Sequence, residues 1–517
     1  MKNDNKIQIC DCTLRDGGYY TNWDFDVDLV KSYLSSMNEN PAITHIEIGY
    51  RSNPVPEYHG EYFYCPDHVL KLASQLCKNK KIAIMLNERD TQVKDLDRLL
   101  APCLSYIHVV RLAVDPKNLN RAITLCRVIK EKGFEIGFNI MYMPNWINDN
   151  IFIRQLKKLD GLADFIYLVD SFGSIYPEDI QYAIENIKKE TNIPIGFHGH
   201  NNLELGLANS LKALENGCQI IDATITGIGR GAGNLRTELL LTSLNAKKLV
   251  KVDYNKLNPI VARFEKMKLK YAWGTNLPYM ISGAYSLPQK EVMNWISKRR
   301  YTTESIINAL QNKKNKIIDN FDVPLLRNES PIKQVVIVGG GSNSMKHSHA
   351  LKLFCLKNPQ TAIIHAGTRF VHLFNELPNL QYYCLLGSEG YKLEKSLPKL
   401  DLSNVKCIIE PSPRKMGTIL PDKIIATTYE LSEINFIDDY PNSLLTLAFQ
   451  LTVNLKAQEI FLFGLDGYDL KTDEQMIEVS KENQILVDRL LFLNMRLKTF
   501  TPSKYQGLET ESIYSKL

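Results

Sequence analysis

The feature that most constrains the fold is a repeated alternation of short apolar runs with longer amphipathic stretches over the first 250 residues. Eight of the apolar runs predict strands, at residues 7–12, 45–48, 82–86, 106–112, 135–141, 165–169, 195–200 and 220–224. Segments with helical periodicity lie between them, for example at residues 27–37, 69–76, 118–132 and 205–216. Eight strand–helix repeats over this length predict a parallel sheet closed into a (β/α)8 TIM barrel. An open doubly wound sheet is the structural rival, and it is disfavoured because no glycine-rich phosphate loop follows the first strand.

The chain changes character after the predicted barrel. Residues 255–325 have aromatic and apolar residues at helical spacing, which predicts helices at residues 266–271, 289–299 and 304–312. A helical subdomain packed on the barrel is favoured over a lid. The stretch Asn-Glu-Ser-Pro at residues 328–331 predicts a linker. We therefore expect a barrel domain at residues 1–250, a helical extension at 251–328 and a further domain at 332–517.

The last third of the chain again alternates strands and helices. Strands are predicted at residues 335–338, 361–365, 382–386, 407–410 and 459–463, and a helix at 347–356. A Rossmann-like α/β domain is expected. The first strand ends in a glycine-rich turn in which Gly339, Gly341 and Ser342 are candidates for holding the phosphate of a nucleotide or sugar nucleotide. The alternative is that these glycines only permit a tight turn.

Composition limits the class of partner and the compartment. A formal net charge of +5 over 517 residues predicts neither nucleic acid nor membrane as a partner. No apolar run approaches the roughly 20 residues of a spanning helix, and the polar residues 1–6 do not resemble a signal peptide. The ten cysteines form no Cys-x-x-Cys pair, which indicates reduced, mostly buried thiols. We expect a cytoplasmic protein.

A His-x-His pair lies at the end of the seventh predicted strand. Residues i and i+2 of a strand share a face, so His198 and His200 point to one place, as the ligands of a divalent metal do. The alternative is two unrelated loop histidines. Other polar residues also fall at predicted strand ends, where TIM barrels carry their active sites: the stretch 11–18 on the loop after the first strand, Glu47, Asn139, Asp170, Ser171, Asp222 and Thr224.

Three stretches carry a resemblance to a known family. They are Asp-Cys-Thr-Leu-Arg-Asp-Gly at residues 11–17, His-Gly-His-Asn-Asn at 198–202 and Gly-Ile-Gly-Arg-Gly-Ala-Gly-Asn at 227–234. Together they resemble the barrel metallolyase (HMG-CoA lyase-like) superfamily, and within it the 4-hydroxy-2-oxovalerate aldolases most. The resemblance covers roughly residues 7–250 and does not reach the C-terminal domain.

The resemblance implies a metal site and a reaction class. Asp16, His198 and His200 match the family's metal ligands, and Asn234 stands where some members have a further ligand. Two imidazoles and a carboxylate suit a divalent ion, with Mn²⁺ expected first and Co²⁺, Mg²⁺ or Zn²⁺ as alternatives. Such an ion chelates an α-keto acid and stabilises the enolate that forms when the adjacent C–C bond breaks. Arg15 matches the catalytic arginine, which stabilises the enolate oxygen.

The residues around this centre are less specific. Glu47, Asn139, Asp170 and Ser171 are expected near the substrate, as its hydrogen-bond partners or as partners of the metal ligands. One position departs from the resemblance, because Tyr19 stands where the hydroxy-oxovalerate aldolases have a histidine that acts as base. A phenol, with an ordinary pKa of about 10, is a poor base near neutrality. Tyr19 is therefore a catalytic candidate with an equal alternative, that it only walls the pocket.

Three functional hypotheses follow. The first is a metal-dependent aldolase acting on a pyruvate-type α-keto acid and an aldehyde. The second is a Claisen-type condensation of an α-keto acid with an acyl-CoA. The third is a catalytically weakened barrel fused to a nucleotide- or glycan-precursor-binding domain. Barrels of this kind often self-associate, so a homo-oligomer is compatible with the sequence. An aldehyde dehydrogenase partner is not assumed, because a further domain follows the helical segment.

Overall fold

The computed structural model describes residues 7–297, 301–318, 322–327, 330–414, 417–440, 442–468, 474–493 and 495–517. The polar residues 1–6, the first half of the predicted linker (328–329) and the end of the helix predicted at 289–299 lie outside these ranges. By contacts the chain forms two compact units, Met1–Met293 and Asn294–Leu517. The division into three domains at 250 and 332 stays a prediction.

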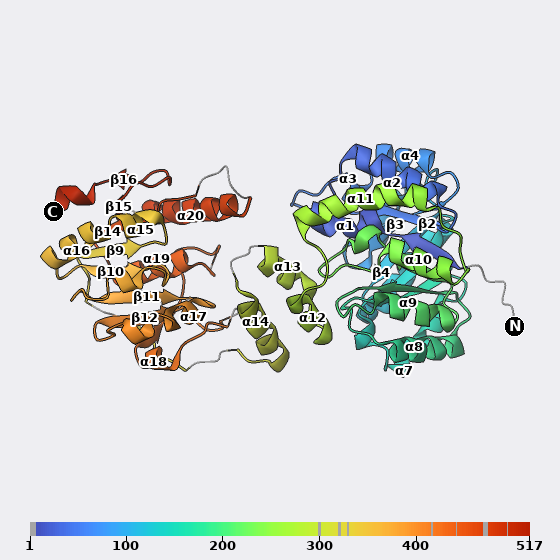
Figure 1. Ribbon diagram of the computed structural model, residues 1–517. Helices are drawn as coiled ribbons and strands as arrows, with labels where there is room; N and C mark the ends of the chain where they lie inside the picture. The colour runs from blue at the N-terminus through green and yellow to red at the C-terminus, as the bar shows by residue number, and fades with distance from the viewer. Residues whose placement is uncertain are drawn as a thin grey trace. The chain divides into compact units, whose positions relative to one another are not determined.

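The first unit is built around a closed barrel of eight parallel strands in the order β1 to β8 (Figure 1). The strands are β1 (Gln8–Asp11), β2 (His45–Tyr50), β3 (Lys81–Asn87), β4 (Val109–Val114), β5 (Glu135–Ile140), β6 (Phe165–Asp170), β7 (Ile195–Gly199) and β8 (Ile220–Ala223). Each lies where the sequence predicts a strand, with ends that differ by a few residues. The prediction of a TIM barrel is confirmed.

Helices surround the barrel in Figure 1. They are α1 (Thr13–Thr21), α2 (Val27–Glu39), α3 (Glu61–Tyr64), α4 (Asp67–Leu76), α5 (Leu96–Leu100), α6 (Leu119–Glu131), α7 (Asn150–Gln155), α8 (Pro177–Glu190), α9 (Gly206–Glu215) and α10 (Thr237–Ala246). The expected loop after the first strand is wrong, because this segment is helix α1. Glycine has a low helix propensity, but close packing requires it here, because a Cβ on Gly18 would lie 2.1 Å from the Trp23 ring.

The barrel has two apolar regions. A large cluster fills the space between the strands and the surrounding helices. A smaller one is formed by Cys10, Cys12, Phe165, Tyr167, Val169 and Ile220, all on or directly after barrel strands. The guanidinium of Arg111 lies 4.1 Å from the centre of the Tyr167 ring, so a charged side chain is part of this second region. The barrel is therefore filled by a mixture of apolar and charged groups.

A helical segment follows the barrel, as predicted. It contains α11 (Tyr254–Tyr271), α12 (Leu277–Ala284), α13 (Gln289–Ser297) and α14 (Thr303–Asn315). Helix α11 is longer than the predicted 266–271, because Asp253 caps it by accepting hydrogen bonds from the next two helical amides. Phe264 of α11 makes an edge contact with Tyr33 of α2. This contact fixes α11 against the outside of the barrel.

The C-terminal part contains an eight-stranded sheet in the order β13-β12-β11-β10-β9-β14-β15-β16, with every pairing parallel. The strands are β9 (Gln334–Val338), β10 (Ala362–His365), β11 (Gln381–Leu385), β12 (Val405–Ile409), β13 (Thr428–Glu430), β14 (Glu459–Phe463), β15 (Arg496–Thr499) and β16 (Glu509–Thr510). The five predicted strands are present, and the Rossmann-like architecture is confirmed. Three short strands of four residues or fewer were not predicted from the sequence: β13 and β16 at the two edges of the sheet, and β15 next to β16.

Helices cover both faces of this sheet. They are α15 (Ser342–Lys346), α16 (Ser348–Lys357), α17 (Glu389–Glu394), α18 (Asp422–Ile425), α19 (Leu444–Asn454) and α20 (Glu474–Phe492). Apolar residues of α19 and α20 form one core with the sheet, and those of α16 form another on different strand residues. Because successive side chains of a strand alternate between faces, these two cores lie on opposite sides.

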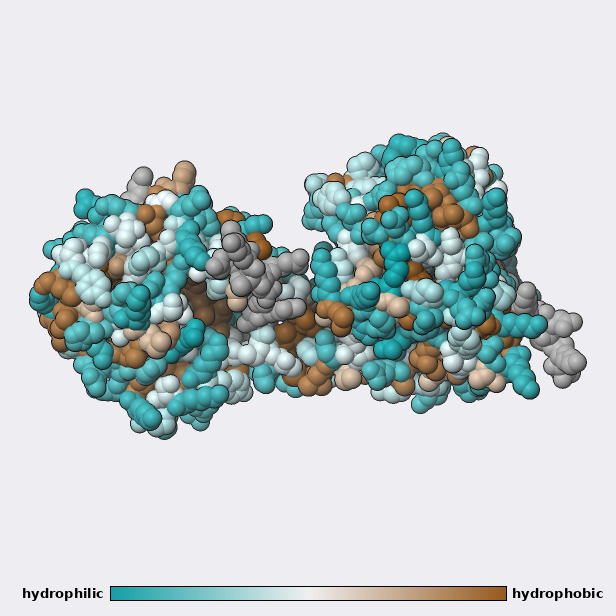
Figure 2. Space-filling view, turned by 45° about the horizontal axis from the view of Figure 1, so that its top comes forward, coloured by the Kyte–Doolittle hydropathy of each residue, from teal (hydrophilic) through white to brown (hydrophobic). Residues whose placement is uncertain are grey.

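The visible faces of both units are mainly hydrophilic, with hydrophobic residues in small groups (Figure 2). Among the residues described, no helix combines the length and apolar character needed to cross a bilayer.

Asp11 links the first strand to helices α1, α2 and α10, and these contacts lead to a stability prediction. Its Oδ1 accepts hydrogen bonds from the Thr13 amide at 3.0 Å and the Tyr33 hydroxyl at 2.6 Å. Its Oδ2 accepts one from the Thr237 hydroxyl at 2.6 Å. Asp11→Ala leaves these buried donors unpaired, so we expect the free energy of unfolding of the barrel to fall by about 3–5 kcal/mol.

Urea denaturation followed by circular dichroism measures this loss. Asp253→Ala is the matched control, since it removes a half-buried carboxylate that caps α11 and should cost only about 1 kcal/mol. Equal losses in the two variants would contradict the structural role of Asp11.

Candidate functional site

Two imidazoles are held at the carboxyl end of β7. His198 Nδ1 lies 2.8 Å from Asp222 Oδ2, and His200 Nδ1 lies 2.7 Å from the backbone oxygen of Asp170. These contacts use the Nδ1 atom of each ring and leave both Nε2 atoms for the site. The ring centres are 5.1 Å apart. Burial, reinforced by His198 and Arg230, holds the pKa of His200 well below its usual value, so the ring is neutral, as a metal ligand must be.

A carboxylate reaches the imidazoles from helix α1. Asp16 Oδ2 lies 3.5 Å from His198 Nε2 and accepts a hydrogen bond from Asn234 Nδ2 at 2.8 Å. Its other oxygen is paired with Arg15. Arg15 in turn donates from Nε to Glu47 Oε2 at 2.8 Å. The structure therefore brings Arg15 and Asp16 of α1 together with His198 and Asn234, which are far from them in the sequence.

One cavity collects these residues. It has a volume of about 30 Å³ and is lined by Arg15, Asp16, Tyr19, Tyr50, Met85, Ala113, Asn139, Met141, Val169, His198, His200 and Arg230. A volume of this size holds an ion or a water molecule but not a keto acid. Tyr19 and Arg230 are its half-buried polar residues, whereas Asp16 and both histidines are buried. A substrate must therefore displace side chains at this side of the cavity.

The donor set fits a divalent metal ion. Two imidazole nitrogens and a carboxylate are ligands that first-row divalent ions accept. Each histidine is held through Nδ1 by an oxygen acceptor, the arrangement that orients metal-binding histidines. The side-chain oxygen of Asn234 is buried and has no hydrogen-bond partner among the described residues. Asp16, His198 and His200 therefore remain the predicted ligands of the ion, with Asn234 Oδ1 as a predicted further donor.

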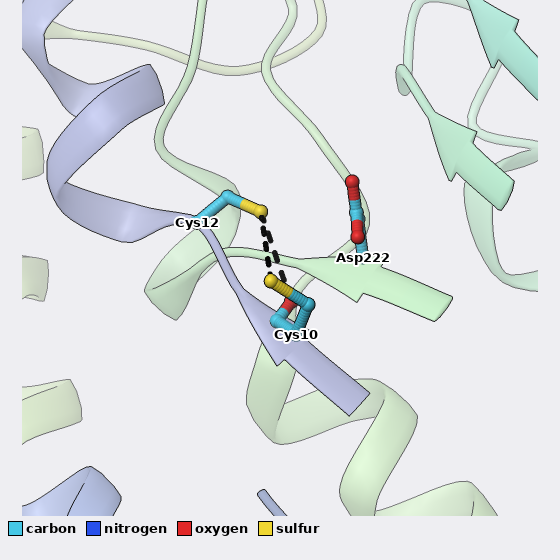
Figure 3. Close-up of side chains that lie close together, drawn as sticks. All are labelled: Cys10, Cys12 and Asp222. Carbon is cyan, nitrogen blue, oxygen red and sulfur yellow. Dashed lines mark hydrogen bonds between the residues drawn. The ribbon is translucent and has the colours of Figure 1, made fainter. Parts of the chain in front are cut away.

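A tighter cluster of potential metal ligands lies beneath this cavity. Cys10, Cys12 and Asp222 are the described residues that offer three ligand atoms within 4.8 Å of one another, and Figure 3 shows the two sulfurs of β1 and its end facing the carboxylate of β8. The guanidinium of Arg111 already supplies the positive charge beside this cluster, because it donates to Cys12 Sγ at 3.2 Å and pairs with Asp222. Burial raises the pKa of the Cys12 thiol. A protonated thiol beside a fixed guanidinium is a poor metal ligand, so we favour the histidine site.

Arg111 connects the carboxylates behind the site. Its Nη1 lies 3.1 Å from Glu47 Oε2, and Nη2 is paired with Asp222. Burial opposes the ionisation of Asp222, but Arg111 and His198 outweigh it and hold the pKa of this carboxyl below its usual value. An ionised Asp222 accepts a hydrogen bond from His198 Nδ1–H, and this tautomer leaves Nε2 free.

The predicted substrate residues take different positions. Asn139 lines the cavity. In the amide orientation that satisfies its hydrogen bonds, the side-chain oxygen of Asn139 accepts from Arg111 Nη2 at 2.8 Å. Glu47 lies behind Arg15 and does not line the cavity. Asp170 caps the following turn through Ser174, and Ser171 Oγ accepts from the Tyr142 amide at 2.8 Å. Burial raises the pKa of Asp170 to about 6. Their assignment to the substrate stays a prediction.

Tyr19 lies on the same wall as Tyr50. The two hydroxyl oxygens are 3.1 Å apart, and the Arg230 guanidinium is 5.4 Å from the centre of the Tyr19 ring. Burial raises the pKa of Tyr50 well above its usual value, so its hydroxyl stays protonated. Sequence reasoning did not single out Tyr50, Arg111 or Arg230. Arg230 could have been found, because it lies within the glycine-rich motif at 227–234.

The glycine turn of the C-terminal unit holds a carboxylate of its own chain. Asp466 Oδ2 accepts from the Asn343 amide at 3.0 Å and from Ser342 Oγ at 3.2 Å. A Cβ on Gly339 would lie 2.7 Å from the oxygen of Gly464, and one on Gly341 would lie 2.5 Å from Asp466. The tight-turn interpretation accounts for both glycines without a phosphate.

A closed parallel barrel with imidazole and carboxylate side chains at its carboxyl end defines the first unit as a TIM-barrel protein of the kind that binds small molecules there. The chain belongs to the HMGL-like family, which matches residues 6–262. The family match ends before the C-terminal unit, as the sequence predicts.

Three relatives describe the similarity. A 4-hydroxy-2-oxovalerate aldolase of Carboxydothermus hydrogenoformans is 31% identical, over 46% of this chain and 70% of that protein. An oxaloacetate decarboxylase of Mycobacterium tuberculosis is 26% identical, over 48% of this chain and 73% of the length of that decarboxylase. The crystal structure of the N-terminal domain of a candidate aldolase from Bacteroides vulgatus is 51% identical and matches with a TM-score of 0.56, covering 59% of this chain and all of that one. These likenesses support a lyase or aldolase for the first unit.

The contact between Asp222 and His198 generates a prediction on metal affinity. Asp222→Asn keeps the size of the side chain but removes the charge that orients the imidazole. We expect Mn²⁺ affinity, measured by calorimetry on chelator-treated protein, to fall about 10–100-fold. Asp164→Asn is the matched control, because Asp164 lies before β6 and pairs with Lys130. Unchanged affinity in Asp222→Asn, with the control equal to wild type, would contradict this role.

Proposed function

We propose that the barrel is a divalent-metal-dependent aldolase that makes or cleaves the C–C bond between a pyruvate-type enolate and an aldehyde. The observation that carries this proposal is the convergence of Arg15, Asp16, His198 and His200 on one buried cavity. The names of the relatives support the same reaction class. The substrate and the direction of the reaction belong to the proposal.

The side chains divide the task. A divalent ion held by Asp16 and the two histidines, Mn²⁺ first among the candidates, supplies Lewis-acid stabilisation of negative charge on the oxygens of the keto acid. Arg15 is buried, and although burial opposes its charge, Asp16 and Glu47 raise its pKa well above the usual value. It therefore stays protonated and donates to the enolate oxygen as that charge develops. Glu47 acts by holding the guanidinium in place.

The two tyrosines are proposed to move the proton. Cleavage requires that the substrate hydroxyl lose its proton as the C–C bond breaks, giving an aldehyde and an enolate. Tyr19 Oη lies 3.1 Å from Tyr50 Oη, and the pair would relay this proton to water. The enolate carbon takes up a proton afterwards, so the keto acid and the aldehyde are released with no net change of charge. The cation of Arg230 beside the Tyr19 ring stabilises negative charge near it.

Arg230 is proposed to bind an anionic part of the substrate. Its Nε is buried without a hydrogen-bond partner, and it has no carboxylate partner within the part of the chain that the structure describes. A guanidinium in such a position favours a carboxylate ligand. The carboxylate of the keto acid, or that of an acidic aldehyde, would satisfy it.

Turnover of pyruvate with a panel of aldehydes tests the reaction. We expect a new product by mass analysis that disappears after chelator treatment and returns with added Mn²⁺. Arg15→Ala should lower kcat/KM by about 10²–10³-fold, because it removes a donor to the developing charge. Arg89→Ala, which changes an exposed arginine, is the matched control. Full activity of an Asp16→Asn, His198→Ala double variant without metal would end the proposal.

The same screen separates the alternatives. Oxaloacetate is included, because its decarboxylation yields the same pyruvate enolate and one relative carries that name. Release of thiol from acetyl-CoA in the presence of keto acids would favour the Claisen-type reaction. A protein that neither contains nor takes up a divalent ion would favour the weakened barrel.

Substitution of Tyr19 tests the proton path. Tyr19→Phe should lower kcat about 10²–10⁴-fold, the usual contribution of a general acid–base group, with a small change in KM. Tyr20→Phe is the control, since the Tyr20 hydroxyl donates to the backbone oxygen of Gly231 instead. A Tyr19→Phe enzyme that retains its kcat would show that the ring only walls the pocket.

A further inference from the structure

A second and larger cavity lies within the C-terminal unit. It has a volume of about 800 Å³, within the usual range for small-molecule sites. Its lining includes the residues directly after β9, β10, β11 and β14. Strands β10 to β13 extend from β9 in one direction and β14 to β16 in the other, so the order of the sheet reverses between β9 and β14. Ligands of open parallel sheets bind outside the carboxyl ends of the strands at such a reversal.

One side of the cavity carries a carboxylate oxygen that can accept a hydrogen bond from a ligand. Asp466 lines it, and its Oδ2 is held by the Asn343 amide and the Ser342 hydroxyl of the glycine turn. Its Oδ1 is buried and has no hydrogen-bond partner within the part of the chain that the structure describes. A buried carboxylate oxygen without a donor is costly, so a ligand hydroxyl would stabilise it. The turn itself cannot take a phosphate, because a carboxylate already occupies its amide.

Another side offers donors for an anion. Helix α19 begins in the cavity wall, where residues 442–445 line it, and its first turn has neither an acidic residue nor a side-chain cap. Ser443, the residue before the helix, is only 7% exposed, and no described group pairs with its hydroxyl. The positive end of an eleven-residue helix with a free buried hydroxyl is suited to a phosphate.

Two cations lie on the same side. Gly367 is close both to the start of α19 and to Glu389. A Cβ built on Gly367 would be 3.7 Å from Leu444, at the start of α19, and 3.8 Å from Glu389 Oε2. Glu389 is paired with Lys392, and Arg369 follows Gly367 closely along the chain. Lys392 and Arg369 both line the cavity. Glu389 neutralises Lys392, and Arg369, which donates to the backbone oxygen of Gly340 at 3.1 Å, is the cation of this lining without a carboxylate partner among the described residues.

Aromatic rings complete the wall. Tyr468, Tyr505 and Phe370 line the cavity, and Tyr468 is 37% exposed. Rings of this kind pack against the faces of planar heterocycles. The cavity thus combines an anion-binding end, an acceptor for hydroxyl groups and aromatic surface.

We propose that this cavity binds a nucleoside phosphate, free or as the nucleotide part of a sugar nucleotide. The phosphate binds at the N-terminus of α19 with Ser443, Lys392 and Arg369. A ribose hydroxyl donates to Asp466 Oδ1, and the base lies against the tyrosines. This site is separate from the metal centre of the barrel and does not depend on the proposed aldolase reaction.

Calorimetry on the full chain tests the proposal with CMP, UDP, GDP and ADP, and with inorganic phosphate and the free nucleosides as comparison ligands. We expect at least one nucleotide to bind with a Kd of about 1–100 μM, at least tenfold more tightly than phosphate or its own nucleoside. The matching sugar nucleotide then shows whether the sugar adds affinity. Absence of nucleotide binding, or binding no tighter than that of inorganic phosphate, would overturn the proposal.

Variants and an analogue locate the ligand. Asp466→Asn and Ser443→Ala should each weaken binding at least tenfold, whereas Asp401→Asn, which changes an exposed aspartate of the same unit, should not. The 2′,3′-dideoxy form of the bound nucleotide should also bind at least tenfold more weakly to the unaltered protein, and this measurement does not depend on the folding of any variant. Equal affinity for the ribo and dideoxy forms would contradict the role of Asp466.

Discussion

The barrel site depends on one buried guanidinium, that of Arg111. It lies between Glu47 and Asp222 inside the barrel, where unpaired charges would be strongly destabilising. Glu47 orients Arg15, and Asp222 orients His198. The two branches meet again at Asp16, which is paired with Arg15 and lies 3.5 Å from His198. Loss of the central cation would therefore disturb both Arg15, which is proposed to bind the enolate, and His198, which is proposed to bind the metal.

The sequence predicts the barrel and the main site residues for clear physical reasons. Strand and helix periodicity differ, so the eight repeats are visible without a structure. His198 and His200 share a face because they are two residues apart on β7. Helix α1 was not predicted, since a Gly-Gly pair is unfavourable in a helix and only packing against Trp23 favours it. Arg111 was also missed, because its partners come from β2 and β8 and their meeting depends on closure of the barrel.

The C-terminal unit shows a different limit of sequence reasoning. The glycine turn after β9 has the composition of a phosphate loop, yet Asp466, more than a hundred residues further along the chain, takes its amide. The N-terminus of α19 has no sequence motif, because its only signal is the lack of an acidic cap near Ser443. Asp466 pairs with the start of α15, whereas the start of α19 has no side-chain cap. This difference depends on contacts between residues far apart in the sequence. The sequence pattern therefore predicted the α/β domain, but not the side of the domain that is proposed to bind a ligand.

The two histidines of β7 are not equivalent, and this has a consequence for the ion they would share. His198 is backed by the carboxylate of Asp222, which gives its ring partial imidazolate character, whereas His200 is backed by the neutral carbonyl of Asp170. An ion held by these two residues would therefore receive more electron density from His198 than from His200. The protein would thus set the Lewis acidity of that ion partly through Asp222, which lies behind the imidazole and does not line the cavity.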